Sequence, residues 1–202
     1  MDSAPPDKQP ARAAHTGQRG ERPMLPTLPR DTLTLRDGRV IHMRPIHSDD
    51  APRLQDFHHR LSHQSLYFRF FGEMPELNRQ LAERLSDVDY VERMAIVATP
   101  AADADAPIIA VARYQRVEEP AARAAELALA VEDSWQGQGI GPQLLRALAT
   151  HARDRGFTTL VANVLYDNSR MLAMLRHLGI PSTHHLREGR VEVRLDISTG
   201  NA

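Results

Sequence analysis

A glycine-rich turn, placed between a strand-like run and a helix-like run, constrains the fold of this chain more than any other feature. Residues 126–131 are apolar after Glu126, residues 136–141 read Gln-Gly-Gln-Gly-Ile-Gly, and residues 142–153 follow a helical pattern. The N–H groups in the first turn of a helix have no partner within it and lie at the positive end of its dipole, so they can hold a phosphate. Glycines at 137, 139 and 141 leave that approach free of Cβ atoms. The sequence therefore predicts a strand, an anion-binding turn and a helix.

The turn differs from two common nucleotide-binding motifs. A P-loop ends in Gly-Lys-Ser/Thr, whereas Gly139 is followed by Ile140, Gly141 and Pro142, and Lys8 is the only lysine of the chain. The dinucleotide fingerprint spaces its glycines as G-x-G-x-x-G after a first strand, whereas here they read G-x-G-x-G in the second half of the chain. Both nucleotide-binding classes are therefore disfavoured, and an ordinary tight turn is the remaining alternative.

The flanks of the turn resemble the GNAT superfamily of acetyl-CoA-dependent N-acetyltransferases. The pyrophosphate loop of that family reads Gln/Arg-x-x-Gly-x-Gly/Ala, which Gln136, Gly139 and Gly141 match. Further matches are the strand at 125–131, the apolar helix positions at 144–148, Asn168 with Met171, and Leu-Gly-Ile at 178–180. The resemblance covers residues 31–198. It implies an α/β (α+β) GNAT fold, in which a mixed, mostly antiparallel central sheet is flanked by helices.

Three segments narrow the resemblance within the superfamily. Residues 43–46, 67–72 and 126–131 look like the acetyltransferase domain of bacterial protein lysine acetyltransferases. The function implied is transfer of an acetyl group from acetyl-CoA to an amine, a protein lysine ε-amine, by direct attack in a ternary complex. The partners implied are acetyl-CoA and protein lysine substrates. An acetyltransferase for a small amine and a non-enzymatic acyl-CoA-sensing module are the alternatives.

The resemblance also implies a binding site for acetyl-CoA. Its residues come from the end of the strand, the glycine turn and the start of a later helix: Leu129, Ala130, Val131, Gln136, Gly137, Gln138, Gly139, Ile140, Gly141 and Asn168. Main-chain N–H groups at 129–131 would stabilise the negative charge that develops on the thioester oxygen. Asn168 would contact the pantetheine arm or the acceptor, and a plain helix N-cap is its alternative role.

Glu126 is the residue that the resemblance implies as catalytic base. A lysine ε-ammonium has a pKa of about 10.4, so roughly one amine in a few thousand is unprotonated at pH 7 and something must accept the proton. Burial in the apolar strand would make Glu126 a better proton acceptor near neutrality. Strand alternation supports another interpretation, a surface position on the face opposite Leu127 and Leu129. Many GNAT enzymes carry a tyrosine acid where this chain has Leu175, and a CoA thiol with a pKa near 8.5 can leave without one.

Periodicity outside the turn predicts the remaining elements. Strands are expected at 32–35, 40–43, 94–98, 108–114, 127–131, 158–164, 183–187 and 191–197, and helices at 48–61, 64–70, 75–85, 141–155 and 168–178. An Asp-Gly pair at 37–38 predicts a hairpin turn, and Ser48, Asp49 and Asp50 are expected to cap the first helix.

Composition sets the expected boundaries and partners. Residues 1–30 hold six of the fourteen prolines and predict a disordered tail, followed by the acetyltransferase domain at 31–198 and a C-terminal tail at 199–202. The absence of cysteine and the spacing of the histidines at 58, 59, 63, 184 and 185 predict surface histidines and no metal site. A net charge of −1 predicts no nucleic-acid partner. The sequence has no apolar run of about 18 residues and no signal peptide, so we expect no membrane partner and a cytoplasmic location. We expect the protein to be a monomer or a homodimer.

Overall fold

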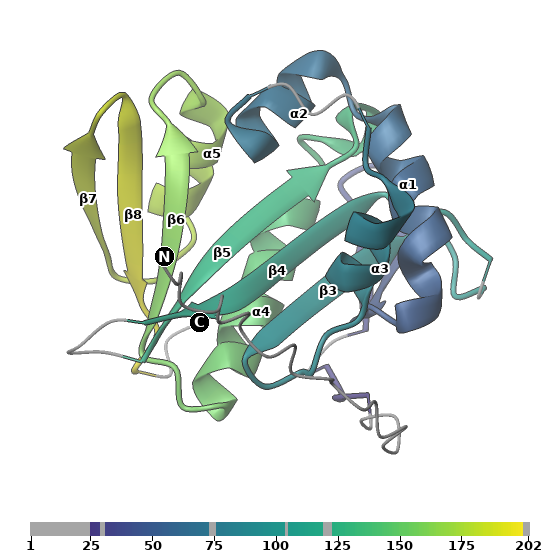
Figure 1. Cartoon of the computed structure of the whole chain (residues 1–202), viewed down its shortest axis with the longest axis horizontal. Coiled ribbons are helices and arrows are strands. Elements are labelled where there is room, and N and C mark those ends of the chain that lie inside the picture. The colour runs from purple at the N-terminus through teal and green to yellow at the C-terminus, as the bar shows by residue number, and fades with distance from the viewer. Residues whose placement is uncertain (1–24, 29–30, 73–75, 104, 119–122, 200–202) are drawn as a thin grey trace, which may run out of the picture.

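The computed structural model describes residues 25–28, 31–72, 76–103, 105–118 and 123–199. They form one mixed sheet with helices on both faces (Figure 1). The strands are β1 Thr32–Thr34, β2 Val40–Pro45, β3 Arg93–Thr99, β4 Ala110–Val117, β5 Ala124–Val131, β6 Thr159–Leu165, β7 Ser182–Arg187 and β8 Arg190–Asp196. The helices are α1 Ala51–Arg60, α2 His63–Phe70, α3 Arg79–Ser86, α4 Ile140–Asp154 and α5 Ser169–Arg176, with short 3-10 turns η1 Ser48–Asp50 and η2 Asp133–Trp135.

The sheet has the order β1-β2-β3-β4-β5-β6-β8-β7, and every neighbouring pair is antiparallel except β5 with β6. The parallel pair is short, because residues 124–126 of β5 pair with residues 159–161 of β6 and the strands then diverge. Figure 1 shows this divergence, with α2 lying above it. The crossover that makes the pair parallel contains α4. Beyond residue 126, the backbone groups on this edge of β5 therefore have no strand partner among the described residues.

The core forms where the two helical layers cover the middle of the sheet. Residues 94–98 of β3 are all buried, as expected of a central strand covered on both faces. Helix α4 packs against β3, β4 and β5, and its apolar residues recur at helical spacing on one face. That face consists of Leu144, Leu145, Leu148, Ala149 and Ala152, each with at most 1% of its surface exposed.

The predicted fold class and element order are confirmed, with two local corrections. The third helix begins at Arg79, after an N-cap by Asn78, rather than at 75, which lies outside the described residues. The cap expected from residues 48–50 is not formed on α1, because these residues make a separate 3-10 turn and Asp50 gives no side-chain cap. The buried Asp50 carboxylate instead accepts hydrogen bonds from Arg44 at 2.6 and 2.8 Å. Burial acts to raise the pKa of Asp50, but these bonds hold it below its usual value.

Most of the predicted N-terminal tail, residues 1–24 and 29–30, lies outside the described residues, as do residues 200–202. Within residues 25–28, Leu28 is buried against the core. No helix in the described part of the chain is both long enough and apolar enough to cross a membrane.

Candidate functional site

The glycine turn leads directly into α4, as the sequence predicts. Gly137 and Gly139 have φ values of 77° and 92°, a region that residues with a Cβ avoid. Gly139 is the N-cap of α4, and no side chain among the described residues caps this helix end. The N–H groups of the first turn of α4, apart from Pro142, which has none, are therefore available to an anion.

Gly141 has a packing role that the sequence did not indicate. Its backbone is helical, and a Cβ added there would lie 3.0 Å from Met174 Sδ and 3.1 Å from Leu129 Cδ2. Cβ atoms added at Gly137 and Gly139 would meet no heavy atom within 4 Å. The third glycine thus permits close packing of α4 against α5 and β5, whereas the first two are required by the backbone conformation.

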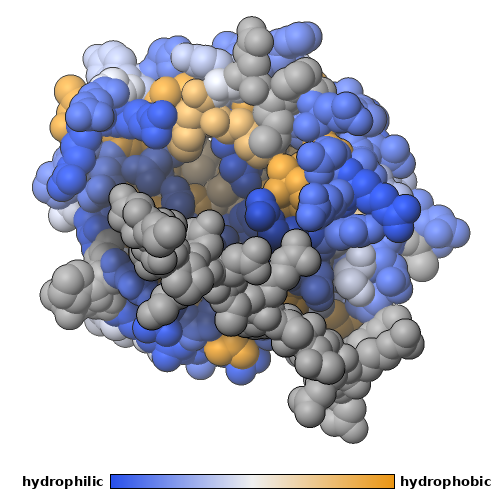
Figure 2. Space-filling view, viewed as in Figure 1, coloured by the Kyte–Doolittle hydropathy of each residue, from blue (hydrophilic) through white to orange (hydrophobic). Residues whose placement is uncertain are grey.

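The divergent edge of β5 presents main-chain donors beside the turn. The Glu132 N–H donates to Ile109 O on the β4 side. Because successive N–H groups along a strand point to opposite sides, those of Leu129 and Val131 point away from β4, toward the gap that opens before β6. The same alternation turns the Ala130 N–H toward β4. Figure 2 shows the surface hollowed in this region, with hydrophobic residues at its depth and upper edge and hydrophilic residues at its sides.

The side chain of Gln136 links the turn to both neighbouring helices. Its Nε2 donates to Val131 O at 3.0 Å and to Ser65 Oγ of α2 at 3.2 Å, and its Oε1 accepts from Arg170 of α5. Asn168 is the N-cap of α5, since its Oδ1 accepts from the Met171 N–H at 3.1 Å. The N-cap alternative for Asn168 is thus the one seen here, and its amide nitrogen is not used in that bond.

Asp133, which the sequence did not single out, holds the start of α2 to the turn. Its carboxylate accepts from the Ser62 N–H and Oγ at 3.0 and 2.8 Å and from Ser65 Oγ at 2.9 Å. Burial acts to raise the pKa of Asp133, but these hydrogen bonds hold it below its usual value. We refer to Ser62, Ser65 and Asp133 as the α2 clamp. Only its place directly before the glycine turn marks Asp133 in the sequence.

Glu126 lies where β5 and β6 separate, but it is not desolvated. Its side chain is exposed, contrary to the expected burial, because strand alternation turns it away from the core that contains Leu127. Asn163 Nδ2 of β6 donates to Glu126 Oε1 at 3.1 Å. The carboxylate is thus positioned by the neighbouring strand and open to solvent.

Two arginines share the face of the sheet that carries Glu126. Arg93, Gln115 and Glu126 are cross-strand neighbours on β3, β4 and β5, and such partners point to the same face. Arg113, two residues before Gln115, therefore lies on this face as well. Arg69 of α2 is close enough for its charge to act on Glu126 and on Arg113.

The remaining predictions concern the histidines, a metal site and the position of a tyrosine acid. His58 was expected at the surface but is 2% exposed, since it shares the buried face of α1 with Leu54 and Phe57. No group of three or more possible metal-ligating side chains occurs in the part of the chain that the structure describes. Leu175, where a tyrosine acid would stand, is buried in the core.

Comparison with known proteins agrees with the resemblance to GNAT acetyltransferases. The model of the acetyltransferase (GNAT) family matches residues 56–180. The chain is 36% identical over 124 residues to Acetyltransferase PA5475 of Pseudomonas aeruginosa, covering 61% of this chain and 66% of that protein. It is 36% identical over 147 residues to Acetyltransferase Pat of Mycolicibacterium smegmatis, covering 73% of this chain and 43% of that protein. The chain thus spans less than two thirds of the length of either relative.

Solved structures that are similar to this chain also include acetyltransferase and acyltransferase structures. The GNAT domain of S. lividans PAT is 33% identical with a TM-score of 0.73, and the match covers 82% of this chain and 95% of that one. A cAMP-binding acyltransferase from Mycobacterium smegmatis is 31% identical with a TM-score of 0.56, covering 82% of this chain and 46% of that one.

Proposed function

Because the chain belongs to the GNAT family of acetyltransferases, we propose that it transfers an acetyl group from acetyl-CoA to a protein lysine ε-amine. The observation that carries the proposal is the divergence of β5 from β6 directly after Glu126, with an uncapped helix start at the far end of the same strand. Similarity to Acetyltransferase Pat and to the GNAT domain of S. lividans PAT supports a protein acceptor.

The site divides into a binding end and a reacting end. The pyrophosphate of acetyl-CoA is bound by the open N–H groups at the start of α4, near Gly139. Val131 and Glu126 are separated by five residues of extended strand, about 17 Å, along which the pantetheine arm runs. The N–H groups of Leu129 and Val131 face this path and can donate to the arm or to the thioester oxygen.

The reaction needs one proton acceptor and one leaving group. Glu126 takes a proton from the acceptor ammonium, and Asn163 holds Oε1 of that carboxylate in place. The neutral amine nitrogen attacks the thioester carbon, a C–N bond forms, the C–S bond breaks, CoA leaves as a thiolate, and the nitrogen releases its second proton to solvent. Because Leu175 is buried and apolar, the thiolate takes its proton from solvent.

Release of CoA with defined acceptors tests the proposal. The purified chain is incubated with acetyl-CoA and either a lysine-bearing protein, the same protein with its lysines methylated, or a small polyamine. Acetylation of the unmodified protein alone is expected. Rapid acetylation of the polyamine with every protein unmodified would favour a small-amine acetyltransferase, and tight acetyl-CoA binding without turnover on any acceptor would favour a sensing module.

A further inference from the structure

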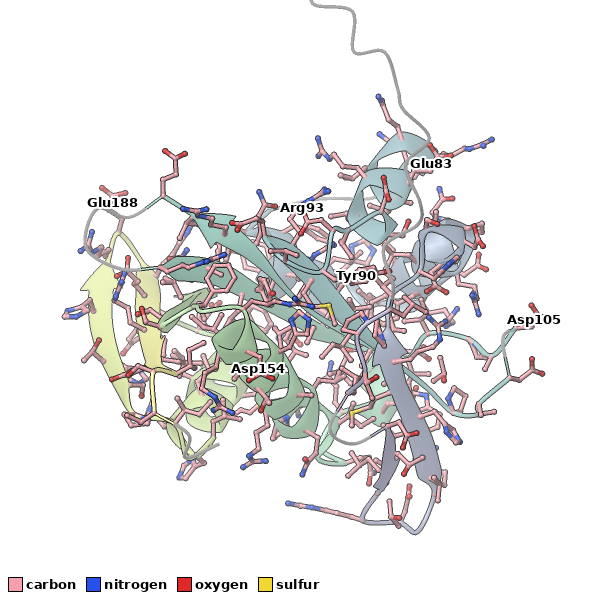
Figure 3. All side chains as sticks on the ribbon, turned by 90° about the horizontal axis from the view of Figure 1, so that it is seen from below. Glu83, Tyr90, Arg93, Asp105, Asp154 and Glu188 are labelled. Carbon is pink, nitrogen blue, oxygen red and sulfur yellow. The ribbon has the colours of Figure 1, made fainter. Side chains whose placement is uncertain are left out.

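The face of the sheet beside the proposed base carries more positive than negative charge. In Figure 3 the sheet lies between Glu83 of α3 and Asp154 of α4, and Arg93 lies on the side of Glu83. The register places Arg113 and Glu126 on that same side, as diagonal neighbours on β4 and β5. With Arg69 of α2 nearby, the cluster holds three guanidinium groups and one glutamate.

The three arginines differ in how far their charge is already neutralised. Arg93 forms an ion pair with Asp89, with Nε and Oδ2 3.2 Å apart. Arg113 donates from Nη2 to Leu85 O at 2.6 Å, which is a neutral acceptor. Arg69 has no hydrogen-bond acceptor among the described residues and only stacks on the Phe70 ring, at 4.8 Å from its centroid. Within the part of the chain that the structure describes, no carboxylate is hydrogen-bonded to Arg69 or Arg113.

Both unneutralised arginines are half-buried, and this makes their charge costly. Burial, together with the smaller effects of the Arg69 and Arg93 charges, lowers the pKa of Arg113 to about 9. Burial also lowers the pKa of Arg69, while the charge of Glu126 opposes that change. The one hydrogen bond that the Glu126 carboxylate makes among the described residues comes from Asn163, and neither arginine bonds it. A second carboxylate in this cluster would be stabilised by charge-assisted hydrogen bonds.

We propose that Arg69 and Arg113 bind a carboxylate that the acceptor carries next to its reacting amine. The inference rests on the proposed acetyl transfer and names the acceptor class of that same site, a lysine with an acidic neighbour. A free amino acid could supply the same carboxylate chemistry, and the experiment separates the two sources.

The test compares short peptides that differ only beside one lysine. Wild type is assayed with acetyl-CoA and peptides in which glutamate, glutamine or arginine precedes the lysine, together with lysine itself and lysine amide. The kcat/KM for the glutamate peptide is expected to exceed that for the glutamine peptide by at least about tenfold. The arginine peptide is expected to be the poorest of the three. Each ratio is taken within one enzyme preparation, so a partly unfolded variant does not distort it.

Variants then connect the preference to the two arginines. Arg69→Met and Arg113→Met are each expected to reduce the glutamate-to-glutamine ratio toward one, and Arg69→Lys to restore part of it. Arg116→Met is the matched control, since Arg116 lies on the same strand, points to the opposite face and pairs with Glu92. It is expected to keep the wild-type ratio.

Each outcome supports or overturns the inference. Equal kcat/KM for the glutamate and glutamine peptides in wild type would overturn it while leaving lysine acetylation intact. A preference that survives in both methionine variants would overturn the assignment to Arg69 and Arg113. A preference for lysine over lysine amide, with no peptide acetylated, would support carboxylate binding and assign it to a small acceptor. Acetylation of nothing would refute the proposed function itself.

Discussion

Replacing Gly141 with alanine tests whether the third glycine of the turn serves packing. The new Cβ would lie 3.0 Å from Met174 Sδ and 3.1 Å from Leu129 Cδ2, closer than ordinary van der Waals contact. Overpacking of this kind costs about 1–3 kcal/mol, and alanine regains up to about 1 kcal/mol over glycine within a helix. The expected net loss in the free energy of unfolding is therefore about 1 kcal/mol, measurable by urea denaturation.

A double-mutant cycle identifies the contact responsible. In a Met174→Ala background the closest atom is gone, so Gly141→Ala is expected to be neutral or stabilising, with a coupling energy of about 1 kcal/mol. Gly139→Ala is the matched control. Its cost comes from a φ of 92° in open space, so it should show no coupling to Met174. If Gly141→Ala is harmless in both backgrounds, the packing role is refuted.

Three further predictions concern the turn, the core and the α2 clamp. Gly139→Val should weaken acetyl-CoA binding at least about tenfold in calorimetry, because valine avoids the φ of 92°, and unaltered affinity would mean that the pyrophosphate binds elsewhere. Burial, and then the charge of Arg155, lower the pKa of His151, so the stability it contributes is present above its unfolded value near 6.5 and is lost as pH falls through the lower folded pKa. The stability of His151→Asn should therefore fall less than that of wild type between pH 6.5 and 4.5, and parallel curves would contradict this. Asp133→Asn should lower the free energy of unfolding by about 1 kcal/mol at pH 7, since it weakens the bonds to Ser62 and Ser65, and the difference should vanish as acid protonates the wild-type carboxylate.

The sequence predicted those features of the fold that are determined by patterns among neighbouring residues. The period of the apolar residues set the order of strands and helices, and the Gly-x-Gly-x-Gly spacing located the turn with its two positive φ values. Alternation along β5 was sufficient to place Glu126 on the exposed side, and the same reasoning applied to α1 would have found the burial of His58, which follows Leu54 at helical spacing.

Contacts between segments that are far apart in the sequence could not be predicted in this way. Asp133 meets Ser62 across 71 positions of sequence, and no periodicity marks either residue. The close packing at Gly141 depends on Met174 of α5, which the turn itself does not reveal. Arg69 and Arg113 come together only because α2 lies over β5 and because β4 pairs with β5 in one register. These side chains could be assigned roles only after the elements had been placed in space.

Turnover by Glu126→Gln, measured together with its acetyl-CoA affinity, tests the central claim most directly. Glutamine keeps the size of the side chain and its bond to Asn163 but cannot accept the proton of an ammonium. The expected result is unchanged acetyl-CoA affinity with a kcat reduced by roughly 10²–10⁴ near pH 7, partly recovered at high pH as free amine accumulates. Near wild-type turnover at pH 7 would contradict a role for Glu126 as the proton acceptor.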